Sequence, residues 1–535
     1  MNQKIGPYFG IIVTIMVVVG SITGGVLLLD QQVTSYSDNA SLLPVSTPEE
    51  QGMDSAKLNQ VLNFIKNKNI DSLVVVRNGH VVLEEYTSID AHLDNTLHGL
   101  ESKHTLKSCS KSVVASLIGI AIDKGYIESV NQKVVDLFPD RTIDNLSEWK
   151  KNLTVEDLLT MRAGYEWWEP SSTSPDHTNP SASPMKMSAS SDWTQFMLDQ
   201  PVEYEPGSVW EYNSGASILL SAIIQQATGM NALDFGNRYL FGPLGITDVL
   251  WTKSPDGVCD GGGGLYMTSR DMAKFGILHL NNGSWNGKQI IPAEWVTNST
   301  RSHHYFTAEK YGGYGYQWWT YPRSRIYFAS GALGQRIYVI PDYDMVVVFT
   351  ASILKGANPE AGLLYHILNA AEENTGYSNY GFYFEYPSML TLKEGGWKYS
   401  SNSDDSGQIE ADMRNYPSTG ISLLWDTVSS SPDLETVLDG YFGDYMAWAG
   451  PRYPIYVELK SRGSVMTSMK SDHEMVYQTY GTIEQGFSLK GIVGTWYCEE
   501  TSRVYITVYW TMVSSISQQG LLAGLQDFLD SLICH

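Results

Sequence analysis

The stretch SCSKSVVASLIGI, residues 108–120, places a serine and a lysine where an apolar segment begins. From Ser112 onward the residues are mostly apolar, and this run predicts a helix buried in the core. Ser108 and Lys111 are three positions apart, so their side chains share one face of a helix. A hydroxyl and an amine placed side by side at the entrance to a core indicate chemistry as well as packing.

A serine hydroxyl is a weak nucleophile near neutral pH and needs a neighbouring group to take its proton. A lysine withdrawn from water can do this, because burial favours the neutral amine. Backbone N–H groups at a helix start favour developing negative charge, so the N–H of Ser108 is a candidate oxyanion donor. The alternative is that Ser108 only caps the helix and that Lys111 is a surface charge.

The spacing S-x-x-K by itself is weak evidence, because it occurs four times in the chain. The copy at Ser183 contains a proline, the copy at Ser147 lies in a polar stretch, and Ser352 follows an expected strand. Only Ser108 opens a long apolar helix, so we take it as the meaningful copy.

Two further segments carry candidate polar groups. PGSVWEYNSGASILLSAIIQQATG, residues 206–229, places Tyr212 and Ser214 just before an apolar helix. YFASGALGQRIYVIP, residues 327–341, places Ser330 and Gly331 at a tight turn that leads into an expected pair of strands. The alternatives are that Tyr212 is packed in the core and that Ser330 is only a turn residue.

A glycine run, residues 261–264, precedes a capped helix. Glycine runs can cradle phosphate, but no G-K-[ST] follows this one, so we interpret it as a tight loop. A group of aromatic residues either lines a substrate cleft or simply packs. This group is Trp167, Trp168, Tyr314, Tyr316, Trp318 and Trp319.

The ends of the first 375 residues predict one sheet. Asp54 caps an amphipathic helix, and Asn78-Gly79 marks a hairpin between two β-rich runs. Two more strands are expected around Pro341-Asp342, followed by a helix over 361–373. The expected fold class is α/β (α+β). It comprises an antiparallel sheet built from N- and C-terminal segments, flanked by helices, with a helical subdomain between them.

These ordered motifs resemble the serine hydrolase family of β-lactamases and penicillin-binding proteins, over residues 45–375. Within it, the chain is similar to the branch of class C β-lactamases, D-amino-acid peptidases and esterases, and 6-aminohexanoate-dimer hydrolases. The resemblance implies a β-lactamase/transpeptidase-like fold and an acyl-enzyme. It implies that Ser108 is the nucleophile, Lys111 its activator and Tyr212 a general base.

The same resemblance implies the substrate-binding positions. Tyr212 and Ser214 match a Tyr-x-Asn/Ser motif, in which Ser214 fills the last position. Ala329-Ser330-Gly331 matches the Lys-Thr-Gly motif that the family carries on a strand, called the strand motif below. The N–H of Ala332 completes the oxyanion hole. Ala329 stands where penicillin-recognising members carry Lys or His, so a cation that holds a substrate carboxylate is missing. Arg336 either compensates or faces solvent. The departure favours amide and ester substrates over lactams and D-Ala-D-Ala peptides.

The chain before residue 51 predicts a membrane anchor. Residues 8–29 carry no charge and are long enough to span a bilayer as a signal-anchor helix. Lys4 precedes this run, so residues 1–7 are expected in the cytoplasm and the bulk of the chain outside. Residues 30–50 form a linker. A cleaved signal peptide, which would release the protein, is the alternative.

After the hydrolase domain, expected over 51–375, the composition changes. Residues 376–535 are rich in aromatic and β-favouring segments and end in an amphipathic helix, which predicts a smaller accessory α/β domain. Its segment YGFYFEYPSML weakly resembles the start of PsbP-like domains. Cys498 and Cys534 could form a disulfide outside the cell.

The totals of the chain exclude one class of partner. There are 58 acidic and 35 basic residues, a net charge of -23, so a nucleic-acid surface is not expected. We expect a serine hydrolase that needs no metal or cofactor and acts on a small-molecule or short-peptide amide or ester. The alternatives are a β-lactamase or D-Ala-D-Ala carboxypeptidase, and a catalytically silent receptor.

Overall fold

The computed structural model describes most of the chain from Leu43 to Thr511. The described residues are 43–65, 69–87, 99–170, 174–306, 312–322, 324–352, 360–372, 374–379, 382–387, 390–395, 398–399, 401–403, 405–413, 419–441, 444, 457–462, 465–470, 473–484, 487–499 and 501–511. The expected membrane helix over 8–29, Cys534 and the amphipathic segment at the C-terminus lie outside them. No helix within the described ranges combines the length and apolar character needed to cross a membrane.

Both ends of the hydrolase segment build one antiparallel sheet, as the sequence predicts. Its strand order is β2-β1-β13-β12-β11-β10-β9-β8. Asn78 and Gly79, with φ of 50° and 76°, form the turn between the first two strands. The strands are β1 (Ile70–Arg77), β2 (His80–Tyr86), β8 (His304–Tyr305), β9 (Gly313–Tyr314), β10 (Trp319–Tyr321), β11 (Ile326–Gly331), β12 (Gln335–Ile340) and β13 (Met345–Ala351).

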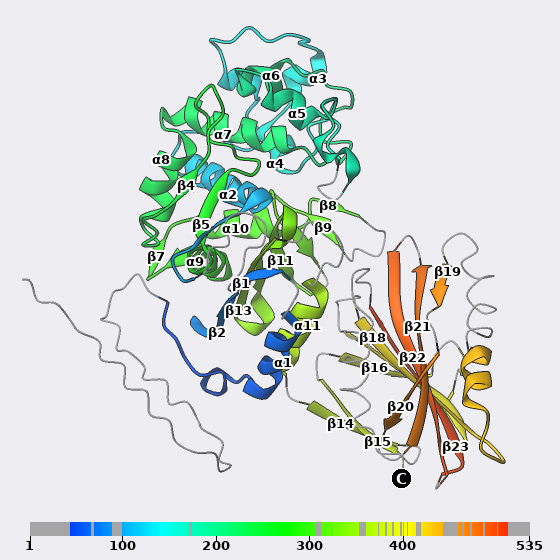
Figure 1. Ribbon diagram of the computed structural model, residues 1–535. Helices are drawn as coiled ribbons and strands as arrows, with labels where there is room; N and C mark the ends of the chain where they lie inside the picture. Colours follow the sequence, from blue (N-terminus) through cyan, green and yellow to red (C-terminus); the bar gives the residue numbers. More distant parts are fainter. Residues whose placement is uncertain are drawn as a thin grey trace, which may run out of the picture. The chain divides into compact units, whose positions relative to one another are not determined.

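Helices cover both faces of this sheet (Figure 1). Val346 and Val348 of β13 belong to the core that includes α2 (Ser110–Asp123) and α9 (Ser269–Leu280). Val347 and Phe349 point the other way, into a core with α1 and α11. Two-sided burial explains why this strand reads as an unbroken apolar run rather than an alternating one. The covering helices on that second face are α1 (Ser55–Ile65) and α11 (Glu360–Ala370).

A mainly helical region is inserted between the two halves of the sheet. It contains short strands in two small sheets, of orders β3-β5-β4 and β6-β7. Its helices are α3 (Glu148–Asn152), α4 (Val155–Leu159), α5 (Ser183–Ser188), α6 (Trp193–Asp199), α7 (Ser214–Thr228), α8 (Ala232–Gly236) and α10 (Ala293–Thr300). Its strands are β3 (Lys103–Thr105), β4 (Leu250–Trp251), β5 (Leu265–Thr268), β6 (Ser284–Trp285) and β7 (Lys288–Gln289).

Four short turns complete the description of this part. They are η1 (Glu49–Gln51), η3 (Val135–Leu137), η4 (Pro175–Thr178) and η5 (Asn237–Phe241). Three others, η2 (Lys107–Cys109), η6 (Ala332–Gly334) and η7 (Pro341–Tyr343), flank the strands and helix that carry the site.

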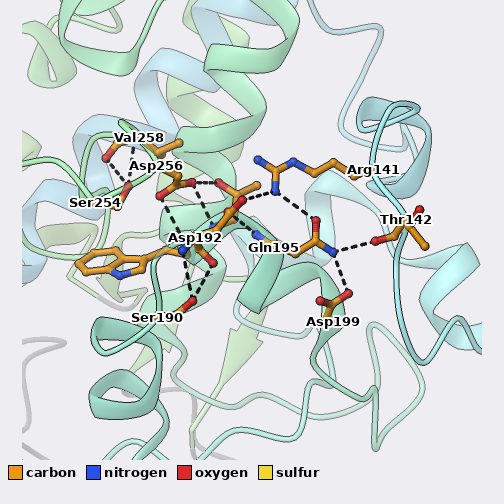
Figure 2. A network of polar contacts seen from close by, with 11 residues as sticks. Arg141, Thr142, Ser190, Asp192, Gln195, Asp199, Ser254, Asp256 and Val258 are labelled. Carbon is orange, nitrogen blue, oxygen red and sulfur yellow. Dashed lines mark hydrogen bonds and ion pairs between the residues drawn. The ribbon is translucent and has the colours of Figure 1, made fainter.

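A polar network joins the start of α6 to the loop before the glycine run (Figure 2). Asp192 caps α6 and pairs with Arg141 at 2.8 Å. Asp256 accepts a 2.7 Å hydrogen bond from the Thr194 hydroxyl and weaker ones from two backbone N–H groups of α6. The loop that leads into residues 261–264 is therefore fixed by charge-assisted hydrogen bonds.

A second antiparallel sheet follows the hydrolase segment. Its order is β16-β17-β18-β23-β22-β21-β19, with β20 paired to β21, and β14 and β15 form a separate hairpin. The strands are β14 (Asn374–Asn379), β15 (Phe382–Pro387), β16 (Leu390–Glu394), β17 (Ser406–Met413), β18 (Thr419–Thr427), β19 (Val457–Arg462), β20 (Met466–Lys470), β21 (His473–Glu484), β22 (Phe487–Cys498) and β23 (Arg503–Thr511). The expected second C-terminal domain is thus present, and its described part is dominated by strands.

The contacts of Asp256 predict an effect of pH on stability. Burial alone would raise the pKa of this carboxyl, but hydrogen bonds from Ser254, Thr194 and backbone N–H groups lower it overall. A pKa that is lower in the folded than in the unfolded state stabilises the fold above the unfolded value, and this contribution disappears as the pH falls through the folded value.

We therefore expect Asp256→Asn to lose about 1–3 kcal/mol of unfolding free energy at pH 7. The difference from wild type should begin to shrink below about pH 4, where the carboxyl of the unfolded chain takes up a proton, and should vanish once the pH has fallen through the lower, folded pKa. Urea denaturation across pH measures both effects, with the exposed Asp140→Asn as the control. Equal stability of the two variants at pH 7 would contradict the assignment.

Candidate active site

Ser108 lies in the 3₁₀ turn η2, directly before α2. Lys107, its predecessor, has a φ of 48°, in the left-handed region that a non-glycine residue adopts only at a cost. This bend in the backbone follows β3 and directs the chain into α2. Cys109, the next residue, is fully buried, and burial raises the pKa of its thiol to about 12. It is therefore a small core residue, as expected, and not a thiolate nucleophile.

Lys111 is buried, with 1% of its surface exposed. Its Nζ lies 3.0 Å from Ser108 Oγ, 3.0 Å from Ser214 Oγ and 2.6 Å from the carbonyl oxygen of Gly262. The alternative interpretation of Lys111 as a surface charge is therefore wrong. An ammonium group has three N–H donors, and all three have an acceptor here.

The other three S-x-x-K serines have structural contacts instead. Ser147 caps α3 by accepting the N–H of Lys150, and Ser352 donates to Asp71 at 2.8 Å. Ser183 accepts the N–H of Trp168. Only the Ser108 copy brings its hydroxyl to its lysine in the described part of the chain.

Gln317 fixes α2 against α7. It is 2% exposed and has a φ of 61°. Its carbonyl oxygen accepts from Ser112 of α2 at 2.7 Å, and its side-chain oxygen accepts from Ser217 of α7 at 2.7 Å. Its amide donates to two backbone carbonyls of α4. One buried amide thus sets the relative position of the helices that carry Lys111 and Ser214.

The glycine run forms the wall behind Lys111, and its tight packing supports the loop interpretation. A Cβ on Gly261 would lie 2.5 Å from the carbonyl oxygen of Ser217, and one on Gly264 would lie 2.1 Å from Thr252 Oγ1. Asp260 accepts the N–H of Gly262 at 2.9 Å, and so orients the peptide next to the carbonyl that binds Lys111. Burial raises the pKa of Asp260, although Lys111 and these N–H groups oppose the shift.

Tyr212 lies beside Lys111 at the start of α7. Lys111 Nζ is 4.9 Å from the centre of the Tyr212 ring, a cation–π distance. The Tyr212 ring also stacks on Trp319, at 6.2 Å between centroids. Asn213 caps α7 with its side chain, which places Ser214 in the first helical position. Tyr212 and Ser214 thus lie next to Lys111, where the sequence placed them.

The strand motif at the end of β11 approaches the same turn. A Cβ on Gly331 would lie 2.4 Å from the carbonyl oxygen of Leu106, so only glycine allows this contact. Ala332, in η6, directly follows it. Ser330 pairs with Arg336 across β11 and β12, and Ala329 is fully buried in the core. These contacts place the expected strand residues next to the Ser108 turn.

Arg336 lies against the end of the strand motif. It is half-buried, and its Nη1 donates to the carbonyl oxygens of Gly331 and Gln335 at 2.8 and 2.7 Å. Its guanidinium group therefore braces the strand end.

Most of the expected aromatic cleft residues are packed in the core. Trp167, Tyr314, Tyr316 and Trp318 are each at most 5% exposed. Trp168 is 46% exposed, and Trp319 stacks on Tyr212. The packing alternative is thus correct for four of the six, and Trp319 is one aromatic neighbour of the site.

Glu169 is a contact of the site that the sequence did not indicate. Its Oε1 accepts the Ser214 hydroxyl at 2.6 Å, and its Oε2 accepts the Ser214 N–H at 2.8 Å. The indole N–H of Trp167 donates to Oε2 at 2.8 Å. No cluster of three or more metal-ligating side chains occurs among the described residues.

A two-sided sheet made from both ends of a domain, beside a helical region whose buried helix carries S-x-x-K, defines the fold of β-lactamases and penicillin-binding proteins. A family model described as Beta-lactamase matches residues 69–372, more than half of the chain. The chain therefore belongs to the β-lactamase family, and it is a serine hydrolase of the β-lactamase-related kind.

Similar proteins include two curated relatives and one solved structure. The 6-aminohexanoate-dimer hydrolase of Paenarthrobacter ureafaciens is 25% identical over 302 residues, which is 53% of this chain and 72% of that protein. A protein of Salmonella enteritidis PT4, provisionally named D-alanyl-D-alanine carboxypeptidase, is 22% identical over 51% of this chain and 76% of its own length. A structure from Bacillus anthracis, provisionally named 6-aminohexanoate-dimer hydrolase, is 21% identical, has a TM-score of 0.48, and covers 57% of this chain and 80% of that chain.

The close approach of Gly331 to Leu106 predicts a destabilised variant. In Gly331→Ala the new methyl group meets a backbone carbonyl that cannot rotate away, so we expect a loss of about 1–3 kcal/mol. Chemical denaturation measures it. Gly99→Ala is the control, because a Cβ at Gly99 meets nothing within 4 Å. Gly331→Ala as stable as Gly99→Ala would contradict the contact.

Proposed function

We propose that the protein is a membrane-anchored, extracytoplasmic serine hydrolase that cleaves an amide or ester bond through an acyl-enzyme on Ser108. The observation that supports this most directly is the 3.0 Å contact between Ser108 Oγ and the Nζ of the buried Lys111. A nucleophile within hydrogen-bond reach of a base is the arrangement that covalent catalysis requires. The chain supplies this pair at the junction of α2, α7 and β11.

Acylation uses Lys111 as its neutral amine. Ser108 Oγ attacks the substrate carbonyl carbon while its proton moves to Lys111 Nζ. The oxyanion that forms accepts hydrogen bonds from the N–H groups of Ser108 and Ala332. Tyr212 relays a proton to the leaving nitrogen or oxygen, the bond from that atom to the carbonyl carbon breaks, and Ser108 is left acylated.

Deacylation reverses the roles with water as the nucleophile. Tyr212 takes a proton from a water molecule while it passes its own phenol proton to Lys111, and the water oxygen attacks the acyl carbon. The same two N–H groups hold the second oxyanion. The bond to Ser108 Oγ then breaks, the acid product leaves, and Oγ regains a proton from the Lys111 and Tyr212 pair.

The side chains around the site support a neutral amide or ester as substrate, with Ser214 and Ser330 as polar contacts. Ala329 removes the cation of the strand motif, and the guanidinium of Arg336 is bound to backbone carbonyls. Trp319 offers an aromatic face next to Tyr212. The similarity to a hydrolase named for 6-aminohexanoate dimer agrees with an amide substrate.

The membrane anchor is proposed from the sequence. Residues 8–29 are uncharged, and the only basic side chain before them is Lys4. This pattern favours an anchor helix with the hydrolase domain outside the cytoplasm. The second domain, proposed over 376–535, then acts as an accessory domain on the same side.

A fluorophosphonate probe tests the nucleophile. We expect the probe to label the full chain on Ser108, and Ser108→Ala to abolish labelling and to lower ester turnover by at least about 10³-fold. Peptide mapping by mass spectrometry locates the label.

Lys111→Ala provides the mechanistic counterpart of that experiment. It should remain folded but label far more slowly, because the base is gone. Unchanged turnover would remove Lys111 from the mechanism. Absence of labelling in the wild-type protein would favour a catalytically silent receptor.

A substrate panel tests the consequence of Ala329. Across D- and L-amino-acid amides, short esters, a D-Ala-D-Ala peptide and a lactam, we expect the highest kcat/KM for substrates without a carboxylate next to the scissile bond. As a conservative control, an Ala329→Ser variant changes the side chain at this position without adding a charge. A kcat/KM that is highest for the lactam or the D-Ala-D-Ala peptide would instead make the protein a β-lactamase or carboxypeptidase.

A further inference from the structure

Glu169 makes three hydrogen bonds next to the proposed catalytic lysine, and it has no role in the steps above. Both of its oxygens face the first residue of α7, since Oε1 accepts the Ser214 hydroxyl and Oε2 accepts the Ser214 N–H. Trp167 donates its indole N–H to Oε2 at 2.8 Å and thereby holds the carboxylate from the other side. Glu169 does not touch Ser108 or Lys111 in any of these bonds, so it would act only through Ser214.

The donor in the bond between Ser214 and Glu169 is determined by chemistry. A carboxylate only accepts, so the single hydroxyl proton of Ser214 points to Glu169. The oxygen of Ser214 can then interact with Lys111 Nζ, 3.0 Å away, only as an acceptor. Glu169 therefore sets the direction of the hydrogen bond between Ser214 and Lys111.

The direction of that bond determines what the neutral amine can do. A neutral amine has two N–H donors and one lone pair. Gly262 contributes a carbonyl oxygen, which takes one N–H, and Ser214, fixed as an acceptor, takes the other. The lone pair is left for the third neighbour, the hydroxyl of Ser108.

We propose that Glu169 is a positioning residue that orients the Ser214 hydroxyl away from Lys111, so that the lone pair of the amine is reserved for the proton of Ser108. The inference rests on the proposed function of Ser108 and Lys111. Without the carboxylate, the Ser214 hydroxyl can rotate and donate to the lone pair. Ser108 then has no base, although every heavy atom of the site stays in place.

The surroundings of Glu169 are built to keep it there. Trp167 is 5% exposed, and it packs so closely on α7 that a Cβ on Gly215 would lie 2.8 Å from its ring. The neighbouring residues of the loop are pinned by backbone contacts: Glu166 N–H donates to Pro201, and Trp168 N–H to Ser183. The carboxylate is therefore held by a rigid loop rather than by a flexible side chain alone.

The test measures the rate of fluorophosphonate labelling of Ser108, which reports activation of the hydroxyl without a leaving-group proton. Glu169→Gln can donate to Ser214 through its amide, so it permits the wrong hydroxyl direction. In the protease triad, replacing the carboxylate that orients the base costs about 10⁴-fold. Glu169 is one hydroxyl farther away, so we expect a smaller loss, on the order of 10²-fold in labelling rate.

A double-mutant cycle separates this role from a structural one. Ser214→Ala removes the competing hydroxyl, so in that background Glu169→Gln should change the labelling rate by less than about threefold, a non-additive result. Glu166→Gln, an exposed residue of the same loop, is the matched charge control and should label like wild type. Equal losses from Glu169→Gln in both backgrounds, or no loss in either, would overturn the proposal.

Failure of the proposed function gives a different result, since the wild-type protein would then not be labelled on Ser108 at all. Thermal melts establish that each variant is folded. If Glu169→Gln does not fold, Glu169→Ala decides instead, because it also deprives the Ser214 hydroxyl of its acceptor. The proposal requires this variant to label more slowly than wild type. A wild-type labelling rate would overturn it.

Discussion

The burial of one amine determines how the catalytic half of this protein is put together. Lys111 is the only Lys, Arg, Asp or Glu of α2 before its last turn, and a buried amine is stable only when its hydrogen bonds are satisfied. Its three hydrogen-bond partners come from three separate segments, namely the 3₁₀ turn of Ser108, the first residue of α7 and the glycine run. The bonds that make the lysine tolerable in the core are the same bonds that assemble the site.

Two carboxylates contact the residues that bind Lys111 rather than Lys111 itself. Glu169 accepts a hydrogen bond from the Ser214 hydroxyl, whose oxygen in turn accepts one from Lys111. Asp260 accepts the N–H of Gly262 and so orients the glycine run behind Lys111. Neither forms a direct ion pair with the lysine in the described part of the chain. The amine therefore faces two hydroxyls and a carbonyl oxygen instead of a carboxylate.

The sequence predicts those parts of the candidate site and fold that depend on the spacing of residues close together in the chain. Ser108 and Lys111 follow from the i,i+3 geometry of a helix, and the hairpin follows from Asn78-Gly79, whose φ values suit its turn. Gly331 was identified through its strand motif, and its contact with Leu106 gives the physical reason for a glycine there.

What the sequence could not give depends on long-range contacts without a local pattern. Glu169 lies 45 residues before Ser214, and Gln317 bonds to Ser217 across 100 residues. Nothing near either residue marks it as more than a loop or turn position. The aromatic group failed as a cleft prediction for a related reason, because large side chains next to a site and large side chains in a core have the same composition.

The sheet shared by the two ends of the hydrolase segment also determines when the candidate site can be completed. Ser72 of β1 and Thr350 of β13 touch each other across 278 positions of sequence. While the chain is being synthesised, β1 has only β2 as a partner, and a lone two-stranded hairpin is marginally stable. The helical insert is synthesised during this wait, whereas β11, β12 and β13 are the last strands of this sheet to be made, and β11 brings Gly331 to the Ser108 turn. A chain that ends before β11 therefore carries the S-x-x-K helix without the strand that packs against the Ser108 turn.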